Sequence, residues 1–369
     1  MTKVCHMTST IKSTDARVFH KQCTSLSYAG YDVYLVAQGK SREENGVKVI
    51  GVPIPTGRLK RMTQGARAVY KKALEVNADI YQLHEPELLR YANKLKRKGK
   101  KVVFDSHENY TLQILNKQYL PSFSRYLVAK LYRLYETRVC RKIDAVTIPC
   151  TFNGKNIFEN RARQVVYIDN TPILDELCIK YSPDYHKLKR SICYIGGLTY
   201  ARGITNLVKA AHKASAKLVL AGEFSPESYF DEIKALDAYS CVDYRGFVDR
   251  GGYLRILNEC RVGVCTLLDI GQYSEMDNLA TKVYDYMAMG LPAIVSDFSY
   301  AEKVNKKYKC FVLVNPGDIE ELVKAIDYLL GNPEVANELG QNGRRAVKEE
   351  FNWGIEEKKY IILYKSLEQ

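Results

Sequence analysis

The segment DNLATKVYDYMAMGLP, residues 277–292, contains two aspartates with seven residues between them. If a helix begins near Leu279, Asp277 lies just before its first turn and Asp285 lies about two turns further on. The backbone N–H groups of residues 279–281 would then lack helical partners and could hold a diphosphate, aided by the positive end of the helix dipole. On spacing alone, an ordinary helix capped by Asp277 is the favoured interpretation, because acidic residues are common at helix starts.

A second segment, CYIGGLTYARG at residues 193–203, places two glycines directly after an apolar run. Gly197 would let the backbone approach an anion, and the guanidinium of Arg202 could neutralise that anion and grip two of its oxygens. The alternative is a plain turn, because adjacent glycines after a strand often form only a turn.

Polar residues also follow several expected strands in the first half of the chain. His107 comes shortly after the strand expected at residues 101–104, where the residues of a ligand-binding cleft are expected. A lone histidine is more often structural, but its place just beyond a parallel strand favours a functional one. Four further candidates follow a strand or lie in the first strand–helix loop, namely Asp15, Arg17, His84 and Glu85.

Short apolar runs alternate with helical stretches along the whole chain, and the alternation restarts near Arg190. Strands are expected at residues 3–7, 32–37, 47–52, 80–83, 101–104, 144–148, 165–168, 191–195, 217–220, 242–244, 262–266, 293–295 and 311–314. Helices are expected at residues 19–29, 67–76, 124–142, 204–214, 252–258, 281–289 and 319–330. This order predicts right-handed βαβ units in an α/β protein with two doubly wound, Rossmann-like domains facing a cleft.

Residues 282–292 resemble the donor-site signature of family 4 of the retaining GT-B glycosyltransferases. In that signature two glutamates with seven residues between them are followed by a sequence that contains a small residue, Gly and Pro. Both acids are aspartate in this chain, and aspartate is one methylene shorter than glutamate. Residues 193–203 resemble the strand and Gly-rich loop that hold the donor phosphates. Gly197 stands where the family usually has Arg or Ser, and Arg202 stands where it usually has Lys. Residues 244–248 resemble the loop beside the nucleobase.

The resemblance implies a role for each matching residue. His107 and Asp277 would position the donor sugar at the reacting centre, and Asp285 would bind the nucleotide ribose. The remaining donor-binding residues would be Gly197, Arg202, Phe247, Val248, Leu279, Ala280 and Lys282. Asp15, Arg17, His84 and Glu85 would contact the acceptor. No metal and no cofactor is implied beyond the nucleotide-sugar donor.

The resemblance covers nearly the whole chain and predicts its organisation. Residues 1–175 would form the acceptor-side domain, residues 190–350 the donor domain, and residues 351–369 a helix that crosses back to the N-terminal domain. The implied activity is transfer of a sugar from a nucleotide-diphosphate sugar, with retention of configuration, to a glycan or lipid-linked acceptor in cell-surface polysaccharide synthesis.

The positive charge of the chain is concentrated in its N-terminal part. The 369 residues carry a net charge of +13, and residues 1–190 contain 34 Lys and Arg against 17 Asp and Glu. Basic stretches with interleaved apolar residues occur at residues 58–72, 94–101 and 111–142. Each one alone fits a solvated helix face, but the three together favour peripheral contact with an anionic membrane.

The cysteines and the apolar runs restrict the compartment and the class of protein. Ten cysteines occur without any Cys-x-x-Cys pair, which argues against a zinc cage and favours a reducing cytosol. The apolar runs are strand-sized, so no membrane-spanning helix and no signal peptide is expected. A cytoplasmic protein is therefore expected, and the basic stretches allow a place at the inner face of the plasma membrane. Two alternatives remain, a nucleotide-sugar epimerase on the same fold and, more distantly, a basic nucleic-acid-binding protein; binding to nucleic acid is not expected.

Overall fold

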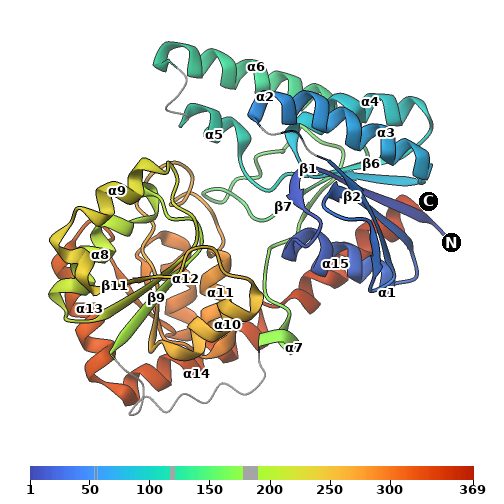
Figure 1. Ribbon diagram of the computed structural model, residues 1–369. Coiled ribbons are helices and arrows are strands. Elements are labelled where there is room, and N and C mark those ends of the chain that lie inside the picture. The colour runs from blue at the N-terminus through green and yellow to red at the C-terminus, as the bar shows by residue number, and fades with distance from the viewer. Residues whose placement is uncertain (54, 56, 117–120, 178–189) are drawn as a thin grey trace. The chain divides into compact units, whose positions relative to one another are not determined.

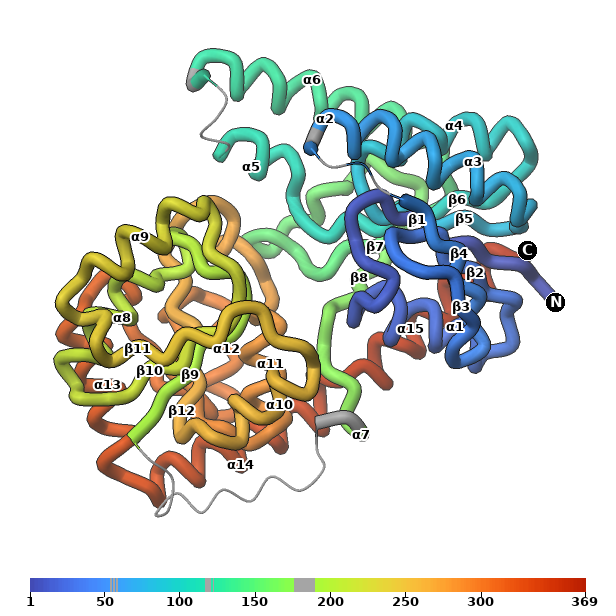
Figure 2. The backbone as a smooth tube through the Cα atoms, in the orientation of Figure 1, coloured from blue at the N-terminus to red at the C-terminus, as the bar shows by residue number. Residues whose placement is uncertain are grey.

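The computed structural model describes residues 1–53, 55, 57–116, 121–177 and 190–369 (Figures 1 and 2). It divides into an N-terminal unit, Met1–Asn170 with Trp353–Gln369, and a C-terminal unit, Thr171–Asn352. Each unit is built on one largely parallel sheet with helices on both faces, which confirms the predicted fold class of two doubly wound α/β domains.

The sheet of the N-terminal unit has the order β3-β4-β2-β1-β5-β6-β7-β8, with only β3 antiparallel to its neighbour. Its strands are β1 (Lys3–Lys12), β2 (Asp32–Gln38), β3 (Arg42–Glu44), β4 (Val47–Val52), β5 (Ile80–Leu83), β6 (Lys101–Asp105), β7 (Ala145–Ile148) and β8 (Val165–Tyr167). Its helices are the π-helices η1 (Ala16–Cys23) and η2 (Arg61–Gly65), the 3₁₀-helix η3 (Pro86–Leu88), and α1 (Thr24–Tyr28), α2 (Arg58–Lys60), α3 (Ala66–Val76), α4 (Leu89–Arg97), α5 (Tyr110–Leu115), α6 (Ser122–Cys140) and α15 (Trp353–Leu367).

The two faces of this sheet differ in chemistry. Helices α3, α4 and α6 lie on one face over an apolar core that includes Tyr81, Leu83 and Phe104 (Figure 1). On the other face α1, η1 and α15 cover buried polar residues, and Trp353 Nε1 of α15 donates to Ser25 Oγ at 2.9 Å. The polar face is where candidate functional groups of this unit are found.

The sheet of the C-terminal unit has the order β11-β10-β9-β12-β13-β14. Its strands are β9 (Ser191–Ile195), β10 (Lys217–Ala221), β11 (Val242–Tyr244), β12 (Val262–Cys265), β13 (Ala293–Ser296) and β14 (Phe311–Val314). Its helices are α7 (Leu174–Leu177), η4 (Tyr200–Arg202), α8 (Ile204–Lys213), α9 (Ser228–Lys234), η5 (Asp237–Cys241), α10 (Arg250–Glu259), α11 (Thr281–Met289), α12 (Ser299–Tyr308), α13 (Ile319–Gly331) and α14 (Pro333–Glu349).

Both faces of the second sheet are apolar. In β9, Ile192 and Tyr194 belong to one buried cluster, while Cys193 and Ile195 belong to the cluster on the opposite face. Side chains of a strand alternate between faces, so a strand covered on both faces is apolar throughout. This burial explains why the strands of the C-terminal unit are visible in the sequence as continuous apolar runs.

Candidate functional site

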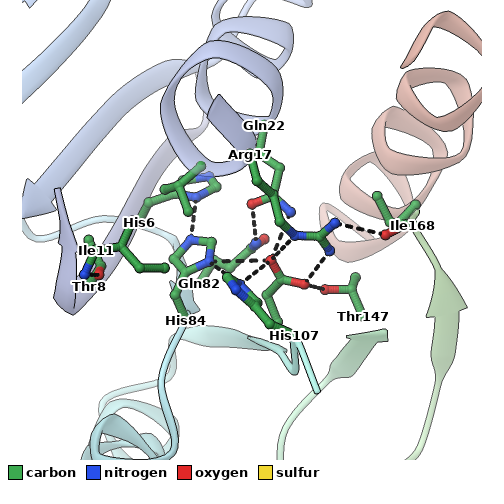
Figure 3. A network of polar contacts seen from close by, with 12 residues as sticks. His6, Thr8, Ile11, Arg17, Gln22, Gln82, His84, His107, Thr147 and Ile168 are labelled. Carbon is green, nitrogen blue, oxygen red and sulfur yellow. Dashed lines mark hydrogen bonds and ion pairs between the residues drawn. The ribbon is translucent and has the colours of Figure 1, made fainter. Parts of the chain in front are cut away.

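A buried carboxylate, Asp105, lies at the end of β6. Figure 3 shows side chains that bond to it from other elements, among them Arg17, His84 and His107. The guanidinium of Arg17 donates to both oxygens of Asp105, from Nε at 3.1 Å and from Nη2 at 2.8 Å. Gln22 Nε2 and Thr147 Oγ1 donate to it as well, each at 2.8 Å. A bidentate ion pair with further donors offsets the cost of burying a charge, so the carboxylate can remain ionised in this position.

Three histidines extend this network. His107 Nε2 lies 3.0 Å from Asp105 Oδ2, and His84 Nδ1 lies 3.3 Å from the same oxygen. The other ring nitrogen of His84 lies 3.0 Å from His6 Nδ1. His6 and His84 are fully buried, whereas His107 is only partly buried. Asp105 therefore fixes the orientation of the one imidazole in this network that reaches the surface of its unit.

The charges of the network follow from burial and from Arg17. Burial alone would raise the pKa of Asp105, but Arg17 and His107 outweigh it and hold this pKa well below its usual range. Burial, reinforced by His84, lowers the pKa of His6 well below its usual value. At neutral pH the network therefore contains an ionised carboxylate and a neutral His6.

His84, Asp105 and His107 present ligand-type atoms within 4.8 Å of one another. The sequence shows no such group because its members come from different strand ends, brought together only by the parallel sheet. Both oxygens of the carboxylate already accept bonds from the Arg17 guanidinium, which would repel a bound cation. The geometry therefore favours an ion pair, whose role is to orient His107, and argues against a metal centre.

The four predicted acceptor-side residues are all bonded within their own unit. Asp15 caps η1, because its Oδ1 accepts from the backbone N–H groups of Arg17 and Val18 at 2.9 Å. Arg17 and His84 belong to the Asp105 network, and the buried Glu85 accepts from the backbone of the β1 end, including Ser9 N at 2.9 Å. Their contact with an acceptor stays a prediction, and their visible role is to hold the strand ends in place.

In the C-terminal unit, two glycines allow the loops at the strand ends to pack closely. A Cβ atom at Gly222, which follows β10, would lie 1.9 Å from the carbonyl oxygen of Gly196. A Cβ atom at Gly203 would lie 2.1 Å from the carbonyl oxygen of Thr266, and its φ of +72° also favours glycine. These contacts hold the loop after β9, with η4 and Arg202, against the ends of the neighbouring strands.

Arg202 and Lys282 meet at this loop. A Cβ atom at Gly196 would lie 3.2 Å from Lys282 Nζ and 3.5 Å from Arg202 Nη1, and one at Gly197 would lie 3.6 Å from the same guanidinium. Lys282 Nζ donates to the hydroxyl of Tyr194 at 3.0 Å. Burial alone would lower the pKa of Arg202, but Tyr194 and Tyr273 outweigh it and raise this pKa. Two cations beside a glycine backbone are the features that bind an anion such as phosphate.

Helix α11 begins at Thr281, as the sequence pattern predicts, and this is two residues after the start near Leu279 on which the diphosphate argument is based. Ala280 occupies the capping position and provides no side-chain cap. Asp277 lies three residues earlier and is half-buried in the preceding segment. The N–H of Leu279 donates to the Tyr284 hydroxyl at 3.2 Å, so this amide already has a partner inside the unit.

Asp285 lies on the buried side of α11 next to two residues that the sequence reasoning missed. The hydroxyl of Tyr253, from α10, donates to Asp285 Oδ2 at 2.6 Å, and Arg250 Nη1 lies 3.7 Å from the same oxygen. Burial and the nearby carboxylate raise the pKa of Tyr253 well above its usual value. Phe247 and Val248 follow β11; the ring of Phe247 is 69% exposed, and Val248 packs against the core.

Comparison with known proteins identifies the class to which these two units belong. The model described as Glycosyltransferase Family 4 matches residues 16–170, and the model described as Glycosyl transferases group 1 matches residues 183–346. The chain therefore belongs to the family 4 glycosyltransferases with the GT-B fold, as its motifs predicted.

Particular relatives are similar at low identity. An uncharacterized glycosyltransferase of Methanocaldococcus jannaschii is 24% identical over 182 residues, which cover 48% of this chain and 45% of that protein, less than half of its length. Sucrose-phosphate synthase from Thermosynechococcus elongatus matches with a TM-score of 0.75 and 17% identity, over 100% of this chain and 99% of that one. Anabaena HepE, in complex with UDP and glucose, matches with a TM-score of 0.73 and 14% identity, over 99% and 100%. At such identities the structural matches show the fold.

Within the part of the chain that the structure describes, no helix is both long and apolar enough to span a membrane.

Proposed function

We propose that this chain transfers a hexose-type sugar from a nucleoside-diphosphate sugar to a hydroxyl group of a glycan or lipid-linked acceptor, with retention of configuration. The observation that carries this proposal is the convergence of Arg202, Lys282 and the glycine backbone of residues 196–197. In such a reaction the bond between the anomeric carbon and the diphosphate oxygen breaks, and the diphosphate leaves with the electron pair. The acceptor oxygen, after losing its proton, bonds to the anomeric carbon.

The two cations fit the demands of this step. Negative charge develops on the leaving diphosphate, and preorganised cations stabilise a transition state more than a ground state in which that charge is smaller. The dipole of α11 adds a partial positive charge at its amino end. We propose that these groups provide the electrostatic stabilisation of the leaving group without an essential metal ion or other cofactor.

Other residues would hold the remaining parts of the donor. The exposed ring of Phe247, with Val248, would lie against the nucleobase, and Asp285 with the Tyr253 hydroxyl would bind the ribose. His107, oriented by Asp105, and Asp277 would position the sugar. For the acceptor, we propose a growing cell-surface polysaccharide or its lipid-linked precursor.

Binding of the donor can be tested by thermal unfolding with UDP, GDP, ADP and their sugars. A ligand that binds only the native state at about 100 times its Kd stabilises by about 2.7 kcal/mol, which shifts Tm by roughly 5–10 °C for a unit of this size. HepE has been solved with UDP and glucose, which makes UDP the first nucleotide to test. We expect one nucleoside diphosphate to raise Tm, and its monophosphate to raise it less.

The same samples separate the alternatives. No Tm shift with any nucleotide or nucleotide sugar would contradict the donor site. Conversion of the donor to an epimer in the absence of any acceptor would show an epimerase instead of a transferase.

A further inference from the structure

The outward face of α6 carries an apolar stripe that none of the described residues of its unit covers. Phe123 is 85% exposed, and Leu127, Leu131 and Leu134 are 57%, 57% and 60% exposed. Their spacing of four, four and three residues places them on one side of the helix. The opposite side, including Ala129 and Val139, is buried in the unit. Isolated apolar residues are normal on a surface, but a continuous exposed stripe marks an interaction site.

Cations flank this stripe. Lys130, Arg133 and Arg138 are exposed on the same helix. The only acid in the sequence of α6, Glu136, is buried, where Tyr132 and Arg161 donate to it at 2.8 and 2.6 Å. The outward face of α6 is therefore both apolar and positively charged.

Helix α4 extends the positive charge. It packs against α6, and its sequence contains no acid. It adds exposed cations of its own, Arg90, Lys94 and Arg97. We name the outward face of α6 together with these three side chains of α4 the α6 surface.

We propose that the α6 surface binds an anionic lipid bilayer peripherally, with the apolar stripe inserted between headgroups and the cations at the headgroup level. Charge complementarity favours this partner over a second copy of the chain, because pairing two such faces would bring like charges together. Nucleic acid would match the cations but would leave the central leucines and Phe123 without an apolar environment. A bilayer interface satisfies both features.

This surface lies in a different unit from Arg202 and Lys282, and the inference does not depend on the proposed sugar transfer. Loss of one function should therefore leave the other intact.

Co-sedimentation with vesicles tests the inference. We expect the chain to bind vesicles of phosphatidylcholine mixed with phosphatidylglycerol, to bind pure phosphatidylcholine far less, and to be released by added salt. The double variant Leu127→Asn/Leu131→Asn should lose binding to the mixed vesicles. Its matched control is Tyr328→Asn/Ile362→Asn, which removes two exposed apolar side chains from α13 and α15 and should bind normally.

A second pair of variants tests the charges. Lys130→Glu/Arg133→Glu should weaken binding at least about 25-fold, because each cation near an anionic surface contributes roughly fivefold. Lys306→Glu/Lys324→Glu makes the same charge change on exposed residues of α12 and α13 and is the control.

Three results would overturn the inference. One is a wild-type chain that does not bind the mixed vesicles, and another is a leucine double variant that binds as well as its control. The third is concentration-dependent dimerisation, measured by sedimentation, that the leucine variant abolishes while vesicle binding is absent. A Tm without ligand and a far-UV circular dichroism spectrum that all the variants share with the wild-type chain show that any loss of vesicle binding is not a loss of folding.

Discussion

Replacement of Arg202 by alanine is expected to lower kcat/KM for sugar transfer by about 10²–10³-fold while the chain stays folded. The Arg202 guanidinium lies 3.5 and 3.6 Å from the positions that Cβ atoms at Gly196 and Gly197 would occupy, beside the loop where the leaving diphosphate would carry its developing charge. Lys282 remains beside the same loop and would retain part of the stabilisation. The measurement is a steady-state assay with the nucleotide sugar that gives the largest Tm shift.

The matched control is Arg190→Ala, which removes a guanidinium from the same unit. Arg190 forms a surface ion pair with Asp327 at 2.7 Å, and such exposed pairs contribute little to stability. The Arg190 variant should keep normal turnover. An Arg202→Lys variant should recover part of the activity, because lysine restores the positive charge but not the planar guanidinium that can donate to two oxygens at once. Near-normal turnover of a folded Arg202→Ala variant would contradict the site.

The largest expected effect on stability comes from Asp105. Asp105→Asn leaves the buried guanidinium of Arg17 without an anionic partner, and breaking a buried pair in this way costs about 3–5 kcal/mol. The free energy of unfolding from urea titration measures this loss. The control Asp32→Asn removes an acid whose partner Lys48 is 44% exposed, and it should cost less than about 1 kcal/mol. Equal losses in the two variants would show that the network is not structural.

The same carboxylate predicts how stability depends on pH. Its pKa is lowered in the folded chain, so the unfolded chain binds the proton more readily. The resulting stability is fully present above the carboxyl's unfolded pKa of about 3.9 and is lost as the pH falls through the lower folded value. In Asp105→Asn this loss of unfolding free energy at low pH should disappear. An acid unfolding transition at the same pH as in the wild-type chain would contradict the lowered pKa of Asp105.

The strands of the C-terminal unit and helix α11 could be predicted because their signal is local. Residues 191–195 and 217–220 are apolar throughout because both faces of the second sheet are covered. The helix expected at residues 281–289 has those bounds in the structure. Gly197, Arg202 and Lys282 lie close together, because the first two follow β9 and the third lies in the first turn of α11. Their binding of a diphosphate stays a prediction.

The contacts that set the chemistry were harder to predict because they join residues far apart in sequence. Arg17 and Asp105 are 88 positions apart, and Tyr253 and Asp285 are 32 apart. The sequence indicated that His107 follows a strand, but not that the acid two residues earlier would orient it. Both the helix geometry and the resemblance to the family predict that the Leu279 amide binds the diphosphate. This amide instead meets Tyr284, a contact that becomes visible only when the side chain of the first turn is placed.

The central claim is that a nucleoside diphosphate binds at the glycine loop of residues 196–197. A crystal structure of the chain with the nucleoside diphosphate that raises Tm most tests it directly. We expect phosphate oxygens within hydrogen-bonding distance, about 3 Å, of Arg202 and Lys282. A diphosphate bound elsewhere, with Lys282 still donating to Tyr194 and the glycine loop empty, would contradict it.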